Sequence, residues 1–237
     1  MQRALITGAS RGIGLELVRQ YVISDDTQVF AAARNPDTAQ ALNELASRHG
    51  DRLIVIRLDV SDETSIHESV KIVEQHTDGI DILINNAGVN PPGNQQSLTS
   101  VRFDLFMDVL GVNTVGPLIV AQAYMDLLRH SDNPKVINIS TTMGSISTRG
   151  SGGNYAYSTS KAALNMVSRL LGNDLRSFGG ICIALDPGWA QTDMGGASAP
   201  LTVEQSASGI IKIVSRLTRD DSGEFLSLRR NGGRHEW

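Results

Sequence analysis

The most constraining feature of the sequence is a regular alternation of short apolar runs with longer amphipathic segments. Seven runs have the length and composition of β-strands, at residues 4–7, 28–32, 53–58, 80–85, 135–140, 181–185 and 224–228. Six helical patterns lie between them, at about residues 12–23, 37–48, 63–76, 102–130, 155–178 and 203–217. Because several runs are almost continuously apolar, we expect parallel strands with helices covering both faces. The pattern predicts an α/β fold in which a seven-stranded parallel sheet is doubly wound.

The same pattern predicts one doubly wound (Rossmann) domain over residues 1–237, because no linker or change in composition divides the chain. A hydrophobic fraction of 41% with 19% charged residues is enough for a buried core. The least regular segments, residues 88–98 and 188–200, each follow an expected strand. Open α/β sheets bind ligands at that edge. We expect the second segment, with Trp189 and Met194, to be a short lid over an apolar substrate site.

Charge and cysteine content argue against several classes of protein. The formal net charge is −4 and no long basic run occurs, so we expect no nucleic-acid partner. No run approaches the roughly 18 apolar residues of a membrane span, and residues 1–7 show a strand pattern without the regions of a signal peptide, so we expect neither a span nor a signal peptide. The single cysteine, Cys182, lies in an apolar run and indicates a buried position in a reducing, cytoplasmic protein. The five histidines have no metal-ligand spacing, so no metal is expected.

A glycine-rich turn joins the first expected strand to the first helix. Its three glycines allow a tight turn, a close approach of the backbone to a pyrophosphate, and close packing of the helix on the strand. The spacing GxxxGxG is a variant of the GxGxxG pattern of dinucleotide-binding folds. The turn therefore predicts a dinucleotide site. The candidate contacts in it are Gly8, Ser10, Arg11, Gly12, Ile13 and Gly14.

The end of the second expected strand indicates which dinucleotide binds. Folds that prefer NAD place an acidic residue about 20 residues after the glycine motif, for the ribose 2′-hydroxyl, whereas this chain has Arg34. An arginine pairs bidentately with a 2′-phosphate, and Arg11 would add a second charge. The sequence thus favours NADP over NAD, the alternative being a solvated Arg34. Asp59, followed by Val60, either accepts a hydrogen bond from the adenine or caps the helix beginning near Glu63.

Two residues four positions apart form the core of a candidate catalytic site. Tyr157 and Lys161 lie on one face at the start of an expected helix. An ordinary tyrosine has a pKa of about 10 and is a poor base near neutral pH. An adjacent ammonium, a helix N-terminus and an oxidised nicotinamide would lower that pKa. Tyr155 has no lysine four positions on, so Tyr157 is the predicted acid/base.

Other polar residues accompany this pair. Ser140 ends the fifth expected strand, where its hydroxyl would bind a carbonyl oxygen that gains negative charge. Asn113 lies inside the long expected helix, beside Gly111 and Gly116-Pro117, which we expect to distort that helix. The remaining candidates follow the fourth and sixth strands: Asn86, Ala87, Gly88, Pro187, Gly188 and Thr192.

In combination these segments resemble the short-chain dehydrogenase/reductase family. The matches occur in order along nearly the whole chain: TGASRGIG at 7–14, LDV at 58–60, NNAG at 85–88, Asn113, Ser140, YSTSK at 157–161 and PGWAQT at 187–192. The resemblance implies that Tyr157 is the general acid/base, that Lys161 lowers its pKa and binds the nicotinamide ribose, and that Ser140 polarises the carbonyl. It also implies that Asn113 holds a water of the proton relay and that Thr192 contacts the carboxamide.

Within the family, PGWAQTDMGG and ARNP at 33–36 are similar to C-factor-like and sniffer-like carbonyl reductases. This resemblance implies NADPH-dependent reduction of a small ketone or aldehyde, reversible as alcohol oxidation. Two alternatives stay open: an NAD-dependent hydroxysteroid or acyl-chain dehydrogenase, and an NAD(P)-binding, C-factor-like signalling protein with secondary turnover. The family commonly forms dimers or tetramers through its two long helices, here 102–130 and 155–178, so we expect a homo-oligomer.

Overall fold

The computed structural model, which describes residues 1–23 and 26–237, contains one sheet in the order β3-β2-β1-β4-β5-β6-β7-β8. Its strands are β1 (Gln2–Thr7), β2 (Thr27–Ala33), β3 (Leu53–Arg57), β4 (Ile82–Asn85), β5 (Lys135–Ile139), β6 (Ile181–Asp186), β7 (Phe225–Ser227) and β8 (Gly233–Arg234). The first seven are parallel. The chain moves outward from β1 to β3 and then crosses to β4, so the strand order reverses between β1 and β4. The predicted doubly wound α/β fold is confirmed.

The eighth strand was not predicted. β8 pairs antiparallel with β7, with Leu226 opposite Arg234. A strand of two residues has no periodicity that a sequence pattern can detect. The strand turns the end of the chain back over the molecule, where the Trp237 ring lies 5.9 Å from the Phe225 ring and the Trp237 carbonyl accepts a 2.8 Å hydrogen bond from Ser147 N–H.

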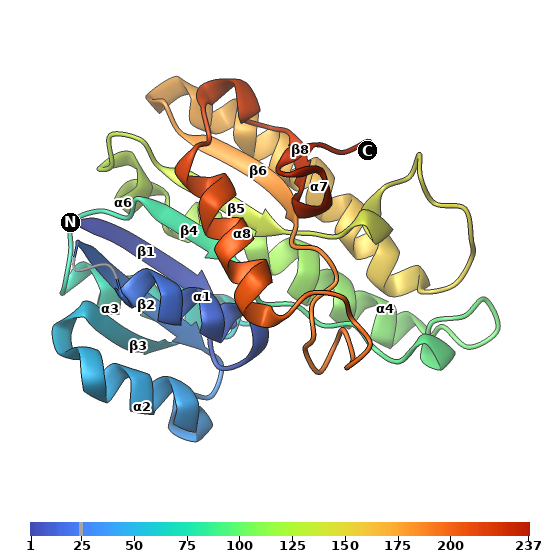
Figure 1. Cartoon of the computed structure of the whole chain (residues 1–237), viewed down its shortest axis with the longest axis horizontal. Helices are drawn as coiled ribbons and strands as arrows, with labels where there is room; N and C mark the ends of the chain where they lie inside the picture. Colours follow the sequence, from blue (N-terminus) through green and yellow to red (C-terminus); the bar gives the residue numbers. More distant parts are fainter. Residues whose placement is uncertain (24–25) are drawn as a thin grey trace.

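Helices cover both faces of the sheet, and Figure 1 shows α1 and α8 side by side on one of them. That face carries α1 (Gly12–Ile23), α2 (Gln40–His49) and α8 (Val203–Ser215), and the other carries α3 (Glu63–Glu74), α4 (Phe103–Leu110), α5 (Gly116–Ala123), α6 (Met125–Arg129) and α7 (Tyr155–Leu175). Alternate strand residues enter opposite cores, with Ala4 and Ile6 in the first and Leu5 in the second. Cys182 is buried in the second core, as expected, and burial raises the pKa of its thiol.

The long helix expected at 102–130 is interrupted where its glycines and proline lie. A π-helical turn, Gly111–Val115, separates α4 from α5, and α6 follows after Tyr124. Pro117 has no N–H for the helix, and a Cβ on Gly116 would lie 2.5 Å from the Val60 carbonyl oxygen. The predicted distortion is therefore confirmed. It sets the direction of Asn113, which is fully buried within the π-turn.

Contrary to the expectation that no stretch approaches the length of a membrane span, Phe103–Ala123 is long and apolar enough to cross a membrane by length and composition, and 33% of its most apolar window is buried. Such a stretch is weak evidence for a span, because core helices pass the same test. Here α4 packs against α7 and the π-turn inserts Asn113 into the interior. Length and hydropathy alone therefore do not assign this stretch to a membrane.

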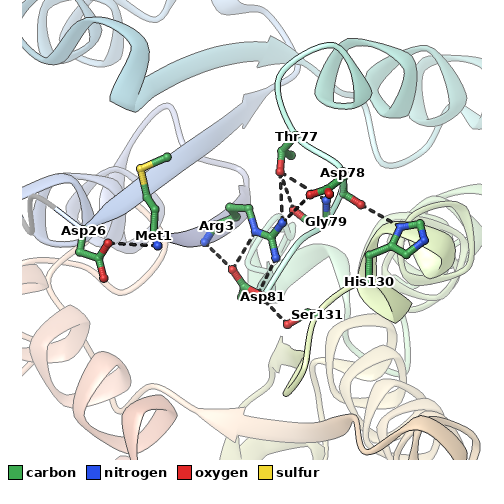
Figure 2. A network of polar contacts seen from close by, with 9 residues as sticks. All are labelled: Met1, Arg3, Asp26, Thr77, Asp78, Gly79, Asp81, His130 and Ser131. Atoms are coloured by element: carbon green, nitrogen blue, oxygen red, sulfur yellow. Dashed lines mark hydrogen bonds and ion pairs between the residues drawn. The ribbon is translucent and has the colours of Figure 1, made fainter.

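A polar network holds the amino ends of the central strands together (Figure 2). Arg3 donates to Asp81 from its main-chain N–H, its Nε and its Nη2, at 2.8 to 3.0 Å. Ser131 donates to the same carboxylate at 2.6 Å, and Arg3 also pairs with Asp78 at 2.9 Å. Burial pushes the pKa of Asp81 up, but its hydrogen bonds to Arg3 and Ser131 outweigh this and lower it. The network links β1 to the segments that enter β4 and β5, at the edge opposite the candidate site.

Candidate functional site

The glycine turn after β1 has a backbone that only glycine adopts freely. Gly8 and Gly12 have φ values of 66° and 56°, in the left-handed region. A Cβ on Gly14 would lie 2.3 Å from the Gly8 carbonyl oxygen, so only glycine lets the first turn of α1 pack this closely on the glycine turn. The Asn86 side chain stabilises the turn, because its Nδ2 donates hydrogen bonds to the carbonyls of Thr7 and Gly8 at 3.0 and 3.2 Å. The turn is thus a backbone-lined cradle at a helix N-terminus, which fits a dinucleotide pyrophosphate.

The segment after β4 connects this cradle to the candidate catalytic residues. Thr7 Oγ1 accepts hydrogen bonds from the main-chain N–H groups of Asn86 and Ala87, at 3.0 and 3.1 Å. A Cβ on Gly88 would lie 3.2 Å from Asn113 Oδ1 and 3.6 Å from Lys161 Nζ. The segment predicted as a cofactor contact therefore lies between the glycine turn and the catalytic candidates.

Asp59 does not cap α3, so that alternative is wrong. Asp62 is the capping residue, with its carboxylate accepting from Thr64 N–H at 3.0 Å. Asp59 accepts instead from the N–H and hydroxyl of Ser61, at 3.0 and 2.6 Å. Burial pushes the pKa of Asp59 up, but the Ser61 hydrogen bonds and the charge of Arg34 bring it below its usual value. An ionised Asp59 near an exposed Arg34 is compatible with a site for the adenosine end of a cofactor.

The segment predicted as a lid contacts the glycine turn. Arg11 Nη1 lies 2.8 Å from Asp193 Oδ2, and both side chains are largely exposed. A Cβ on Gly12 would lie 3.3 Å from Thr192 Cγ2. The Arg11 guanidinium, which we expected at a 2′-phosphate, is thus paired with Asp193 of the lid segment. Sequence patterns could not indicate this ion pair, because the two residues lie 182 positions apart.

The lid segment also reaches the candidate acid/base. Tyr157 Oη lies 4.0 Å from Met194 Sδ, a weak contact for a hydroxyl. Gly195 N–H donates to Thr192 Oγ1 at 2.9 Å, which closes the turn that carries both. Gly188, after Pro187, has a φ of 73°, and a Cβ there would lie 2.5 Å from Leu201 Cδ1. The segment is therefore packed over the cradle and over Tyr157.

Tyr157 and Lys161 lie on the buried face of α7, as the spacing predicted. Tyr157 is 8% exposed and Lys161 5%. Lys161 Nζ donates a 2.8 Å hydrogen bond to the Ile139 carbonyl at the end of β5 and lies 6.0 Å from the centre of the Tyr157 ring. The ammonium is therefore bound to the sheet, near the phenol ring, rather than to the phenol oxygen.

The expected lowering of the Tyr157 pKa does not occur in this arrangement. Burial raises the pKa of Tyr157 to about 12, and the charge of Asp186 adds to the increase. Burial also lowers the pKa of Lys161 to about 8. Both shifts have the same cause, since a buried group loses the hydration that stabilises its charged form. The chain's own groups therefore do not lower the pKa of Tyr157, and the lowering expected with an oxidised nicotinamide beside Lys161 stays a prediction.

Ser140 is held by a residue that the sequence analysis did not identify. Its hydroxyl donates a 2.6 Å hydrogen bond to Asn165 Oδ1, and Asn165 Nδ2 donates to the Gly144 carbonyl at 3.3 Å. Asn165 lies four positions after Lys161 and eight after Tyr157, on the same face of α7. That helical spacing is the signal that would have found it.

Asn113 contacts the loop after β4 and helix α7. Its Oδ1 accepts from Val89 N–H and its Nδ2 donates to the Val89 carbonyl, both at 2.8 Å. Nδ2 also donates to Ser160 Oγ at 3.0 Å. All four predicted catalytic residues are therefore associated with α7. Tyr157 and Lys161 lie on this helix, and Asn113 and Ser140 are hydrogen-bonded to its residues Ser160 and Asn165.

Comparison with known proteins agrees with this geometry. A family model described as short chain dehydrogenase matches residues 2–201. The C-signal of Myxococcus xanthus is 40% identical over 153 residues, which are 65% of this chain and 91% of that protein. A short-chain dehydrogenase of Pyricularia oryzae, RED3, is 33% identical over 94% of both chains.

Solved structures resemble the whole chain. An NADPH-bound carbonyl reductase from chicken fatty liver has a TM-score of 0.93 and 35% identity, covering 100% of this chain and 99% of that one. The carbonyl reductase Sniffer of D. melanogaster has a TM-score of 0.92 and 34% identity, covering 100% of both. The backbone arrangement described above is therefore shared with carbonyl reductases over its full length.

Proposed function

Since this chain belongs to the short-chain dehydrogenase family, an oxidoreductase family, we propose that it is an NADPH-dependent carbonyl reductase that acts on small ketones or aldehydes and reversibly oxidises the alcohols. The observation that carries the proposal is the convergence on α7. Tyr157 and Lys161 lie on this helix, while Asn113 and Ser140 are joined to it by hydrogen bonds to Ser160 and Asn165. A binding protein has no need for this set beside a glycine cradle.

The proposed cofactor is NADPH, which supplies a hydride to the carbonyl carbon when bound. The proposed contacts are those of the glycine turn, the NNAG segment and residues 187–192. Arg34 supports NADPH over NADH, because its exposed guanidinium at the end of β2 suits a 2′-phosphate. The similarity to a carbonyl reductase solved with NADPH points the same way. The NAD-dependent alternative requires that Arg34 have no such role.

The proposed proton donor is Tyr157. A phenol whose pKa is raised to about 12 keeps its proton at neutral pH, which suits donation to the carbonyl oxygen during reduction. Ser140 would bind that oxygen as it gains negative charge. Lys161, fixed by the Ile139 carbonyl, would supply positive charge beside the phenol as the proton leaves.

The proposed substrate is apolar and small. The lid at about residues 188–200 carries Trp189 and Met194, which are 45% and 49% exposed, and Met194 Sδ lies 4.0 Å from Tyr157 Oη. We also propose that one domain spans residues 1–237, that the protein is cytoplasmic, as its single buried thiol suggests, and that it forms a homo-oligomer.

Replacement of Tyr157 by phenylalanine tests the reductase proposal. We expect the parent protein to oxidise NADPH with some members of a panel of small aldehydes and ketones, and the variant to lose at least about 100-fold in kcat. NADPH binding, followed by nicotinamide fluorescence, should persist in both. Equal turnover by parent and variant would contradict the mechanism. A parent that binds NADPH but turns over no carbonyl would favour the signalling alternative, for which the similarity to the C-signal is the supporting observation.

A further inference from the structure

Gln96 is fully buried and contacts the start of the helix that carries Tyr157. Its side-chain Oε1 accepts a 2.9 Å hydrogen bond from the main-chain N–H of Tyr157, 61 positions later. Its main-chain carbonyl accepts a 3.1 Å hydrogen bond from Tyr155 N–H. One residue of the loop after β4 therefore binds two N–H groups in the first turn of α7.

The orientation of the Gln96 amide follows from its partners. Nε2 donates to Asn90 Oδ1 at 3.0 Å and to the Pro91 carbonyl, both of which are acceptors. The Tyr157 main chain offers a donor. A flipped amide would place the Pro91 carbonyl against its oxygen and the Tyr157 N–H against its NH₂ group, so only the described orientation satisfies both main-chain contacts.

Helix α7 has no side-chain cap from its own N-cap residue. Its N-cap residue is Asn154, which has a left-handed φ of 50° and makes no side-chain capping hydrogen bond. N–H groups in a first helical turn have no acceptor within the helix. A capping side chain accepts from the second or third helical residue, and the third residue here is Tyr157. Gln96 supplies that acceptor from a different part of the chain.

The loop that carries Gln96 is also bound at its other end. Val89 forms two 2.8 Å hydrogen bonds with the Asn113 side chain. The segment 89–96 is therefore hydrogen-bonded at one end to the side chain of Asn113 and at the other to the main chain of Tyr157. Exposed residues of the same loop region, such as Leu98, are free to change without breaking either attachment.

We propose that Gln96 is a positioning residue that holds the first turn of α7, and with it the Tyr157 side chain, in the geometry for proton transfer. It does so by replacing the missing N-cap and by tying that turn to Asn90 and Pro91. The catalytic part of this inference depends on the proposed reductase function, whereas the capping part does not. Displacement of a reacting group by about 1 Å is enough to slow a reaction about 100-fold.

Hydrogen exchange of the parent protein is the first test and needs no variant. We expect the Tyr157 amide to be protected in NMR exchange measurements, even though a first-turn amide has no acceptor within its helix. In Gln96→Met, which has a similar length but no hydrogen-bonding amide, that amide should exchange at least about tenfold faster. The amide of Leu164, in the middle of α7, should be unchanged. A freely exchanging Tyr157 amide in the parent, or the same rate in the variant, would overturn the proposal.

Kinetics separate a positioning role from a merely structural one. We expect Gln96→Met to lower kcat about 10- to 100-fold while the dissociation constant for NADPH stays within about twofold of the parent value. Gln95→Met, at the exposed neighbouring position, is the matched control and should change neither. Parallel loss of NADPH binding and of protection along all of α7 would overturn the proposal. If the parent reduces no carbonyl, the reductase proposal fails while the exchange rates still decide whether Gln96 caps the helix.

Discussion

The hydroxyl of Ser140 donates its proton to Asn165 Oδ1 at 2.6 Å. Asn165 is itself oriented by the hydrogen bond from its Nδ2 to the Gly144 carbonyl. Asn165, on α7, therefore holds Ser140 Oγ in one position at the end of β5.

Replacement of Asn165 by leucine tests this relationship. We expect kcat to fall about tenfold, because an unsupported hydroxyl samples several rotamers and is less well placed for the substrate oxygen. Steady-state reduction rates measure the effect, and fluorescence titration should give an unchanged NADPH affinity. Asn165→Asp keeps the acceptor and should lose less activity. Equal activity of Asn165→Leu and the parent would show that Ser140 needs no such support.

Arg34 should determine cofactor preference. Arg34→Ala removes the exposed cation at the end of β2, so the dissociation constant for NADPH should rise about 10- to 100-fold, as expected for the loss of a charge-assisted pair. NADH binding should be almost unchanged, because NADH has no 2′-phosphate. Titration with both nucleotides, followed by nicotinamide fluorescence, measures the ratio. If the preference did not change in the variant, Arg34 would be an ordinary surface arginine.

Asp186 should control the pH dependence of alcohol oxidation. It is 2% exposed, and after burial its charge is the second cause that raises the pKa of Tyr157 to about 12. Oxidation needs the deprotonated phenol, so its rate should increase with pH toward that pKa. Asp186→Asn removes the charge and should shift this increase to lower pH. Ser227→Ala, which removes the 2.8 Å hydrogen bond to Asp186 but keeps the charge, is the control. Identical profiles for Asp186→Asn and the parent would contradict the assignment.

The polar network around Arg3 and Asp81, at the amino ends of the central strands, should make the stability of the fold depend on pH. Hydrogen bonds from Arg3 and Ser131 outweigh burial and hold the pKa of Asp81 below its ordinary value of 3.8. A carboxyl whose pKa is lower in the folded state contributes stability above its unfolded pKa, and this is lost as the pH falls through the folded value.

Asp81→Asn should therefore lower the free energy of unfolding by about 1–3 kcal/mol at pH 7. The difference from the parent should shrink as the pH falls below about 4. Urea unfolding at several pH values measures it. Asp126→Asn, whose carboxylate is 87% exposed in a pair with Arg129, should change stability little. A difference that does not depend on pH would rule out this linkage.

An apolar face on α4 and α7 should form the contact between copies of the chain. Phe103, Met107, Met166 and Leu170 are 49–83% exposed. Leu170→Glu places a charge on this face and should convert an oligomer to a monomer, measured by size-exclusion chromatography with light scattering. Leu98→Glu, at a 77% exposed position in the loop after β4, is the control. An unchanged mass for Leu170→Glu would place the interface elsewhere.

The fold was predictable because strand and helix periods are local properties of the sequence. Almost continuous apolar runs such as that of β6 indicated parallel strands buried on both faces, and all seven were found. Gly116 and Pro117 indicated the interruption of the long helix for the same reason, since their backbone preferences act at their own positions. The short β8 was missed because it forms only where it meets β7.

The candidate site was predictable only in part. The spacing of Tyr157 and Lys161 placed both on one helical face, because four residues make about one turn. Burial, which no local pattern reports, raises the pKa of Tyr157, and the decrease that the sequence suggested depends on an oxidised nicotinamide bound beside it. The cap that Gln96 supplies and the pairing of Arg11 with Asp193 join residues 61 and 182 positions apart. The sequence by itself determined the order of the elements and the identity of the reactive groups. The tertiary structure decided their partners, protonation and support, because these depend on which distant segments the packed sheet brings together.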